Sequence, residues 1–141
     1  MEKEKSTYCS CLSYSANALS RVMTKMADEA FANTGLTSSY AFLLMTVNKE
    51  PGINPSCISG QLQLTPSTVT RLIEKLEVKG LIERRQSGRN TEVYPTPEGM
   101  KLQKTIKEAW ARLYERYTSV LGKEESKSLT QAIYAASQAL E

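Results

Sequence analysis

The 141-residue sequence predicts a mainly α protein of the α+β class, in which one short β-hairpin interrupts a series of helices. Three observations support this class. Apolar residues recur every three or four positions over most of the chain, which is the helical period. A capping residue followed by proline marks helix starts at 54–55, 65–66 and 96–97. Residues 81–94 instead follow a strand, turn, strand pattern.

The segment around which the chain is organised is a short helix expected at 65–79. Thr65 offers a capping hydroxyl, and Pro66 stands at the first helical position, where its missing N–H costs nothing. Gly80 follows where a left-handed residue ends a helix. Four apolar residues at i, i+3, i+4 and i+7 predict one buried stripe: Val69, Leu72, Ile73 and Leu76. The opposite face carries hydroxyls and cations, a composition that suits a DNA major groove.

A second helix is expected to begin at Asn54-Pro55 and to end at the brief Leu62-Gln63-Leu64 connection. Two short helices joined so closely predict a helix-turn-helix. Gly60 stands where we expect the two helices to approach each other, and Cys57 is expected to fill the core between them.

After Gly80, strands are expected at 81–84 and 92–94, with a turn cluster at 86–91 between them. Helix, turn, helix and hairpin, in this order, describe a winged helix-turn-helix. The hairpin tip carries three arginines for which the sequence pattern offers no acidic partner: Arg84, Arg85 and Arg89.

The flanking segments predict helices at about 7–33, 97–121 and 124–140, and a shorter helix from Thr37 to the break at Glu50-Pro51-Gly52. The apolar faces of these terminal helices exceed what one small winged helix could cover. Pairing with a second copy would bury them, and a compact monomeric bundle fits the periodicity equally well.

These motifs resemble the winged-helix segment of the multiple-antibiotic-resistance regulator (MarR) family. The matching pieces are LTPSTVTRLIEKLEVKGLIERR, the GR of the hairpin, and VYPTPEG. The resemblance implies a homodimer that binds double-stranded DNA as a transcription regulator, as a repressor released by a small ligand. It implies dimerisation helices at 1–36 and 98–141 and a DNA-binding region at 37–97, in one continuous fold.

Two positions depart from the family pattern. Ser87 stands where the family usually has an aspartate, so the guanidinium of Arg89 lacks its usual orienting carboxylate. Gln63 stands where the turn before the second helix often has glycine.

Composition excludes several classes of protein. The net charge of +3 is too small to indicate nucleic-acid binding by itself. No apolar run approaches a membrane span, and the N-terminus lacks a secretory signal, so we expect a cytoplasmic protein. The sequence contains no histidine, glycine-rich phosphate loop or nucleophile motif, so we expect no enzyme, cofactor or metal site.

We expect Thr68, Thr70 and Arg71 to contact base edges, and Ser67 and Lys75 to contact phosphates. Glu74 points the same way and is expected to pair with Arg71 or to read a cytosine amino group. The hairpin should add Arg89 in the minor groove. The complete predicted DNA-binding set is Ser67, Thr68, Thr70, Arg71, Lys75, Arg84 and Arg89.

The family resemblance further implies a crevice for a small aromatic effector between the dimerisation helices and the DNA-binding region. Its expected lining is Met23, Met26, Tyr40, Leu44, Met45 and Trp110, although each of these residues also suits an ordinary core. Cys9 and Cys11 leave open a thiol-based redox sensor on the same scaffold, although Ser10 takes the matched position of the family's sensor cysteine. A winged helix used only for protein interaction is the remaining alternative.

Overall fold

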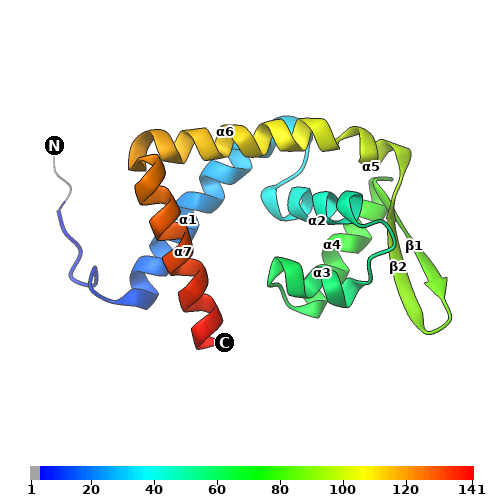
Figure 1. Cartoon of the computed structure of the whole chain (residues 1–141), viewed down its shortest axis with the longest axis horizontal. Coiled ribbons are helices and arrows are strands. Elements are labelled where there is room, and N and C mark those ends of the chain that lie inside the picture. Colours follow the sequence, from blue (N-terminus) through cyan, green and yellow to red (C-terminus); the bar gives the residue numbers. More distant parts are fainter. Residues whose placement is uncertain (1–3) are drawn as a thin grey trace.

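The computed structural model describes residues 4–141. The elements, in order, are α1 (Leu12–Phe31), the 3₁₀ helix η1 (Ala32–Thr34), α2 (Ser38–Lys49), α3 (Pro55–Leu62), α4 (Pro66–Val78), β1 (Ile82–Ser87), β2 (Asn90–Pro95), α5 (Pro97–Lys101), α6 (Gln103–Leu121) and α7 (Lys123–Leu140). The predicted mainly α fold with a winged helix-turn-helix is confirmed. In Figure 1, α6 bridges the molecule, with α1 and α7 at one end and α2–α4 and the hairpin at the other.

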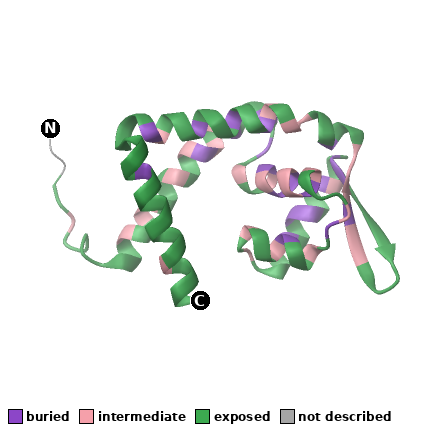
Figure 2. Cartoon of the chain, viewed as in Figure 1, coloured by how far each residue is buried: buried purple, intermediate pink, exposed green. Residues whose placement is uncertain are grey.

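The core lies inside the winged helix-turn-helix and continues along α6. Leu43 and Leu44 of α2, Ile73 of α4 and Val93 of β2 are fully or almost fully buried. Phe31 at the end of α1 and Ile106 of α6 extend this cluster towards the terminal helices. Figure 2 shows the contrast with α7, which is exposed along almost its whole length.

All three predicted cap-plus-proline helix starts are confirmed. The side chain of Asn54 accepts a hydrogen bond from the backbone N–H of Cys57 at 2.8 Å, Thr65 accepts from Thr68 at 3.3 Å, and Thr96 accepts from Gly99 at 3.1 Å. Each cap satisfies a backbone N–H that has no partner inside its helix. The boundaries of the two helices of the helix-turn-helix are therefore fixed locally by the sequence.

The turn between α3 and α4 is held by Gln63 in the left-handed region, with φ of +53°. A side chain in this conformation is strained by about 1–2 kcal/mol relative to glycine. The Ser59 hydroxyl donates to the carbonyl of Leu64 at 2.5 Å, and the Leu64 N–H donates back to the carbonyl of Ser59 at 3.2 Å. These two bonds hold the turn in place without the glycine that the family often has there.

Several predicted features of the helices are wrong. A Cβ at Gly60 would meet nothing within 4 Å, so Gly60 is not a close crossing point. Cys57 is exposed rather than buried in the core. The first helix begins at Leu12 instead of near Thr7.

The predicted 97–121 helix is divided into α5 and α6 at Leu102. The backbone of α5 packs closely against the residue that precedes β1. A Cβ on Gly99 would lie 2.1 Å from the carbonyl oxygen of Leu81, so only glycine fits there. Asn48 of α2 ties this junction together, because its side-chain amide donates to the carbonyl of Gly99 at 3.2 Å and to Gln103 at 2.8 Å.

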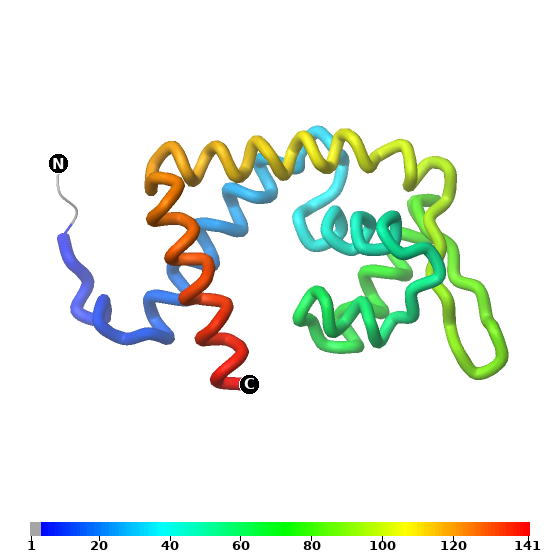
Figure 3. The backbone as a smooth tube through the Cα atoms, in the orientation of Figure 1, coloured from blue at the N-terminus to red at the C-terminus, as the bar shows by residue number. Residues whose placement is uncertain are grey.

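The hairpin is longer and its turn tighter than the sequence pattern predicted. Strand pairing runs from Ile82 opposite Pro95 to Ser87 opposite Asn90, so only Gly88 and Arg89 form the turn. Gly88 has φ of +62°, which is the glycine-first pattern of a two-residue type II′ hairpin turn. In Figure 3 the hairpin extends as a narrow loop at the end of the molecule opposite α7.

Candidate DNA-binding interface

One face of α4 is exposed and the other is buried in the core. The predicted stripe of Val69, Leu72, Ile73 and Leu76 is at most 8% exposed. Ser67, Thr70, Arg71, Glu74 and Lys75 are exposed, and Thr68 is half-buried. The predicted contact residues of α4 therefore lie on the side of the helix that protein does not cover.

The first two turns of α4 carry a cluster of hydroxyls. The Thr65 hydroxyl donates to that of Thr68 at 2.9 Å and lies 3.3 Å from that of Ser67. Arg71 donates to the Thr68 hydroxyl at 3.4 Å. Because only one N–H of Arg71 donates to this contact, its other N–H groups are available to bind a guanine edge or a phosphate.

Thr70 differs from the other hydroxyl residues of α4. Its hydroxyl donates to the carbonyl of Pro66 at 2.9 Å, inside the helix. The group it can offer to a base is therefore its methyl, which suits the methyl of thymine.

The last turns of α4 expose a carboxylate and an apolar side chain in place of the hydroxyl cluster. Glu74 and Val78 follow Arg71 on the exposed face, and Val78 is 89% exposed. Among residues 4–141 no ion pair joins Arg71 to Glu74, so that expected pairing is wrong. A carboxylate and an apolar side chain are poor partners for phosphates, so the N-terminal half of α4 is the half suited to base contacts, and the exposed Lys75 is the residue of the C-terminal half suited to a phosphate.

Two of the three hairpin arginines do have acidic partners, which corrects the sequence prediction. Arg84 forms an ion pair with Glu77 of α4, with 2.7 Å between nitrogen and oxygen. Arg85 pairs with Glu83. Arg89, in the turn, has no ion-pair partner within the described residues.

Arg85 belongs to a cluster on one face of the hairpin. Its guanidinium lies 4.2 Å from the centroid of the Tyr94 ring, and the Tyr94 hydroxyl donates to Glu92 at 2.5 Å. This hydrogen bond raises the pKa of Tyr94 above its ordinary value, with partial burial acting in the same direction. Arg85 is held by the Glu83 carboxylate and the Tyr94 ring, so Arg89 is the arginine of the hairpin free to reach a ligand.

The residues predicted to line an effector crevice do not converge on one cavity. Leu44 is completely buried in the core, so its predicted place in the lining is wrong. Met26 and Tyr40 are half-buried against the same core. Met23 lines a separate small hollow between α1, α6 and α7.

Met45 and Trp110 do share a cavity, of about 760 Å³, between α2, α3 and α6. The rings of Phe42 and Trp110 meet edge to face at 6.2 Å along its wall. Sequence reasoning missed the polar residues of this cavity, because they become neighbours only when α2 packs against α6. They are Asn48, Lys49, Gln61, Gln103 and Lys107.

The two predicted redox cysteines precede the first helix rather than lying within it. Cys9 is in a turn, Cys11 is the residue before Leu12, and both are exposed. The expectation of a cysteine inside the first helix is therefore wrong for both.

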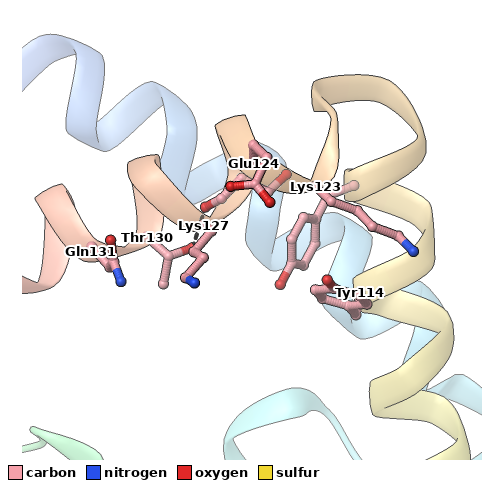
Figure 4. A pocket seen from close by; sticks show the side chains of 8 residues that line it. Tyr114, Lys123, Glu124, Lys127, Thr130 and Gln131 are labelled. Atoms are coloured by element: carbon pink, nitrogen blue, oxygen red, sulfur yellow. Dashed lines mark hydrogen bonds between the residues drawn. The ribbon is translucent and has the colours of Figure 1, made fainter.

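A hollow also lies at the corner between α6 and α7, lined by Tyr114, Tyr117, Lys127 and Thr130 among others (Figure 4). Ser126 beside it is 4% exposed, and its hydroxyl has no hydrogen-bond partner within residues 4–141. A buried hydroxyl without a partner is uncommon.

Solved structures with the same fold include regulators bound to ligand and to DNA. The PcaV transcriptional regulator of Streptomyces coelicolor, in complex with its natural ligand, has a TM-score of 0.85 at 18% identity, covering 99% of this chain and 100% of PcaV. MepR of S. aureus, in complex with DNA, has a TM-score of 0.78 at 23% identity, covering 91% of this chain and 97% of MepR. The uncharacterized HTH-type transcriptional regulator YybA of Bacillus subtilis (strain 168) is 21% identical over 119 residues, 82% of this chain and 79% of YybA.

The exposed hydroxyl-rich face of α4, presented by a helix-turn-helix and followed by an arginine-tipped hairpin, defines a winged-helix DNA-binding protein. A model of the MarR family matches residues 36–91, which run from before α2 into the second strand of the hairpin. The winged-helix segment of the chain therefore matches the MarR family, and the chain is a DNA-binding transcription regulator. No helix among residues 4–141 combines the length and hydropathy that a bilayer crossing requires.

Proposed function

We propose that two copies of the chain dimerise through residues 1–36 and 98–141 and place their α4 helices in successive major grooves of a near-palindromic DNA site. The observation that carries this proposal is the exposed N-terminal half of α4 beside the free Arg89. In this arrangement Thr68, Thr70 and Arg71 contact base edges, while Ser67 and Lys75 contact phosphates. A symmetric pair of readers requires half-sites about one helical turn apart.

The distribution of exposed apolar side chains supports the dimer. Of the fourteen large hydrophobic residues that are exposed within residues 4–141, all but Val78 and Met100 lie in residues 8–22 or 110–140. An apolar surface so concentrated marks a protein–protein interface. The unpartnered Ser126 hydroxyl and the hollow at the α6–α7 corner lie within this surface.

We further propose that the chain is a repressor whose affinity for DNA is lowered by a small aromatic acid in the cavity between α2, α3 and α6. Phe42, Met45 and Trp110 offer apolar and aromatic walls, and Lys49 and Lys107 offer charges that suit a carboxylate. The buried side-chain oxygen of Asn48 has no hydrogen-bond partner within the described residues, so a hydroxyl on the ligand would donate a hydrogen bond to it. The chain then acts by binding, not by catalysis, and does so in the cytoplasm.

The alternatives have less support. The relatives and several structural neighbours are named as transcriptional regulators or repressors, and structures of MepR and of CouR are in complex with DNA. Neither a thiol sensor nor a pure protein-interaction module is favoured by these comparisons.

Substitution of Arg89 by alanine should weaken DNA binding and lower its salt dependence. If Arg89 enters the minor groove, each subunit of the Arg89→Ala variant neutralises about one phosphate fewer. The magnitude of the slope of log K against log salt should therefore fall by about 0.9 for each subunit. Fluorescence anisotropy of a labelled duplex over a salt series measures this slope. Lys104→Ala, which removes an exposed charge from α6, is the control. An Arg89→Ala slope equal to that of Lys104→Ala would contradict a DNA contact by Arg89.

Trp110 is the chain's only tryptophan and lines the proposed effector cavity, so its fluorescence should report ligand binding. A hydroxybenzoate panel should quench it and release labelled DNA over the same concentration range. Lys107→Met should weaken both effects, because the carboxylate loses a charged partner. Lys104→Met should leave both unchanged. Release of DNA by ligands that do not alter Trp110 fluorescence would place the effector elsewhere.

A further inference from the structure

We propose that Glu77 and Arg84 form a positioning pair that sets the angle between the hairpin and α4, and that Arg84 itself does not contact DNA. This inference rests on the proposed function, because it concerns how the two DNA-binding elements are held together. The sequence alone predicts that Arg84 contacts DNA, and this inference assigns it a positioning role instead.

The ion pair joins the last turn of α4 to the middle of β1. Arg84 Nη2 lies 2.7 Å from Glu77 Oε1, and the two side chains are 39% and 28% exposed. Among the described residues, no other ion pair connects α4 with the hairpin. The pair is therefore the charged link between the helix and the strand that leads to the hairpin tip.

Strand register explains why Arg84 faces α4 while Arg85 does not. Arg84 lies opposite Val93, and directly opposed side chains of an antiparallel pair share one face of the sheet. Val93 is completely buried, so Arg84 is on the inner face of the hairpin. Arg85 lies opposite Glu92, on the outer face with Tyr94.

Helical periodicity places Glu77 on the flank of α4 that includes Thr70, two turns earlier. A phosphate bound by Arg84 would also lie close to the Glu77 carboxylate, and that repulsion would oppose the contact. The ion pair instead neutralises both charges. The arginine is thus better placed to orient the hairpin than to bind DNA.

A small change at this pair has a large effect at the hairpin tip. Because Ser87 already pairs with Asn90, Arg89 lies about four residues beyond Arg84 along the hairpin, which at ~3.3 Å per residue is a lever of about 13 Å. A rotation of about 10° at the base would move Arg89 by about 2 Å, enough to break a hydrogen bond. Loss of the pair should therefore disturb the contact made by Arg89.

The test compares wild type, Glu77→Gln, Arg84→Gln and the charge-swapped double variant E77R/R84E by anisotropy on one duplex over a salt series. Each single variant should bind DNA about five- to tenfold more weakly than wild type. This holds even for Glu77→Gln, which removes a negative charge and would otherwise favour DNA binding. The charge-swapped variant should recover affinity to within about threefold of wild type. Glu77→Gln and Arg84→Gln should have the same salt slope, no lower than that of Arg89→Ala, because both act through the Arg89 contact. Arg85→Gln, on the outer face, is the matched control and should bind as wild type does.

Tighter binding by Glu77→Gln, together with a salt slope that is reduced for Arg84→Gln alone, would show that Arg84 binds phosphate and would overturn the inference. A swapped variant no better than the single variants would also overturn it. Because the pair is partly exposed, thermal midpoints should stay within about 3 °C of wild type, which separates positioning from general unfolding. Absence of salt-dependent binding by wild type would instead defeat the proposed function itself.

Discussion

A chain carrying Leu129→Asp and Ile133→Asp should be monomeric and should lose about two to four orders of magnitude in affinity for its DNA site. Both side chains lie on one stripe of α7 and are 41% and 47% exposed in the single chain. In the proposed dimer this stripe is covered, and an unpaired carboxylate buried there would be strongly unfavourable. A monomer binds one half-site only. It lacks the second α4 helix, which in the dimer binds the other half-site at a high effective concentration.

Analytical ultracentrifugation and anisotropy on the same samples measure these two effects. Ala135→Asp is the matched control, because Ala135 lies away from the Leu129 and Ile133 stripe of α7 and is exposed. The control should remain dimeric and bind DNA normally, and far-UV circular dichroism should show the same helix content in both. A dimeric double-aspartate variant would contradict the assigned interface. A monomeric one with wild-type affinity would contradict the need for two readers.

The second large effect is expected from Arg71→Ala, which should cost about 1–3 kcal/mol of binding free energy and relax one base position in each half-site. Arg71 is exposed beside the hydroxyl cluster of α4 and has no ion-pair partner within the described residues. A bidentate contact to guanine has this order of discrimination.

The measurement is anisotropy on duplexes that vary each base of one half-site in turn. Lys104→Ala, which removes the same charge away from α4, should bind with nearly wild-type affinity and unchanged base preference. Equal affinity of Arg71→Ala and wild type for the best duplex would show that Arg71 is not the base-reading residue.

The parts of the fold predicted correctly from sequence are those fixed by local interactions. Asn54, Thr65 and Thr96 cap their helices through hydrogen bonds that span three residues. The buried stripe of α4 follows directly from helical periodicity. These signals need no knowledge of the rest of the chain.

The wrong predictions concern features that depend on register or on distant packing. A shift of one residue in strand pairing exchanges the two faces of a hairpin, so the sequence could not assign Arg84 to Glu77 and Arg85 to Glu83. The close approach of Gly99 to Leu81, which are 18 residues apart in the numbering, likewise depends on packing that no local pattern shows. The effector candidates were chosen by residue type, and only packing of α2 against α6 brings Met45 and Trp110 together.

Selection of binding sites from a random duplex library tests the central proposal most directly, because it requires no known operator. Wild-type protein should enrich a near-palindromic sequence whose half-sites are centred about 10 base pairs apart, and Arg71→Ala should relax the same position in both halves. Enrichment of a single, unrepeated half-site, or of no sequence at all, would contradict a symmetric pair of α4 readers.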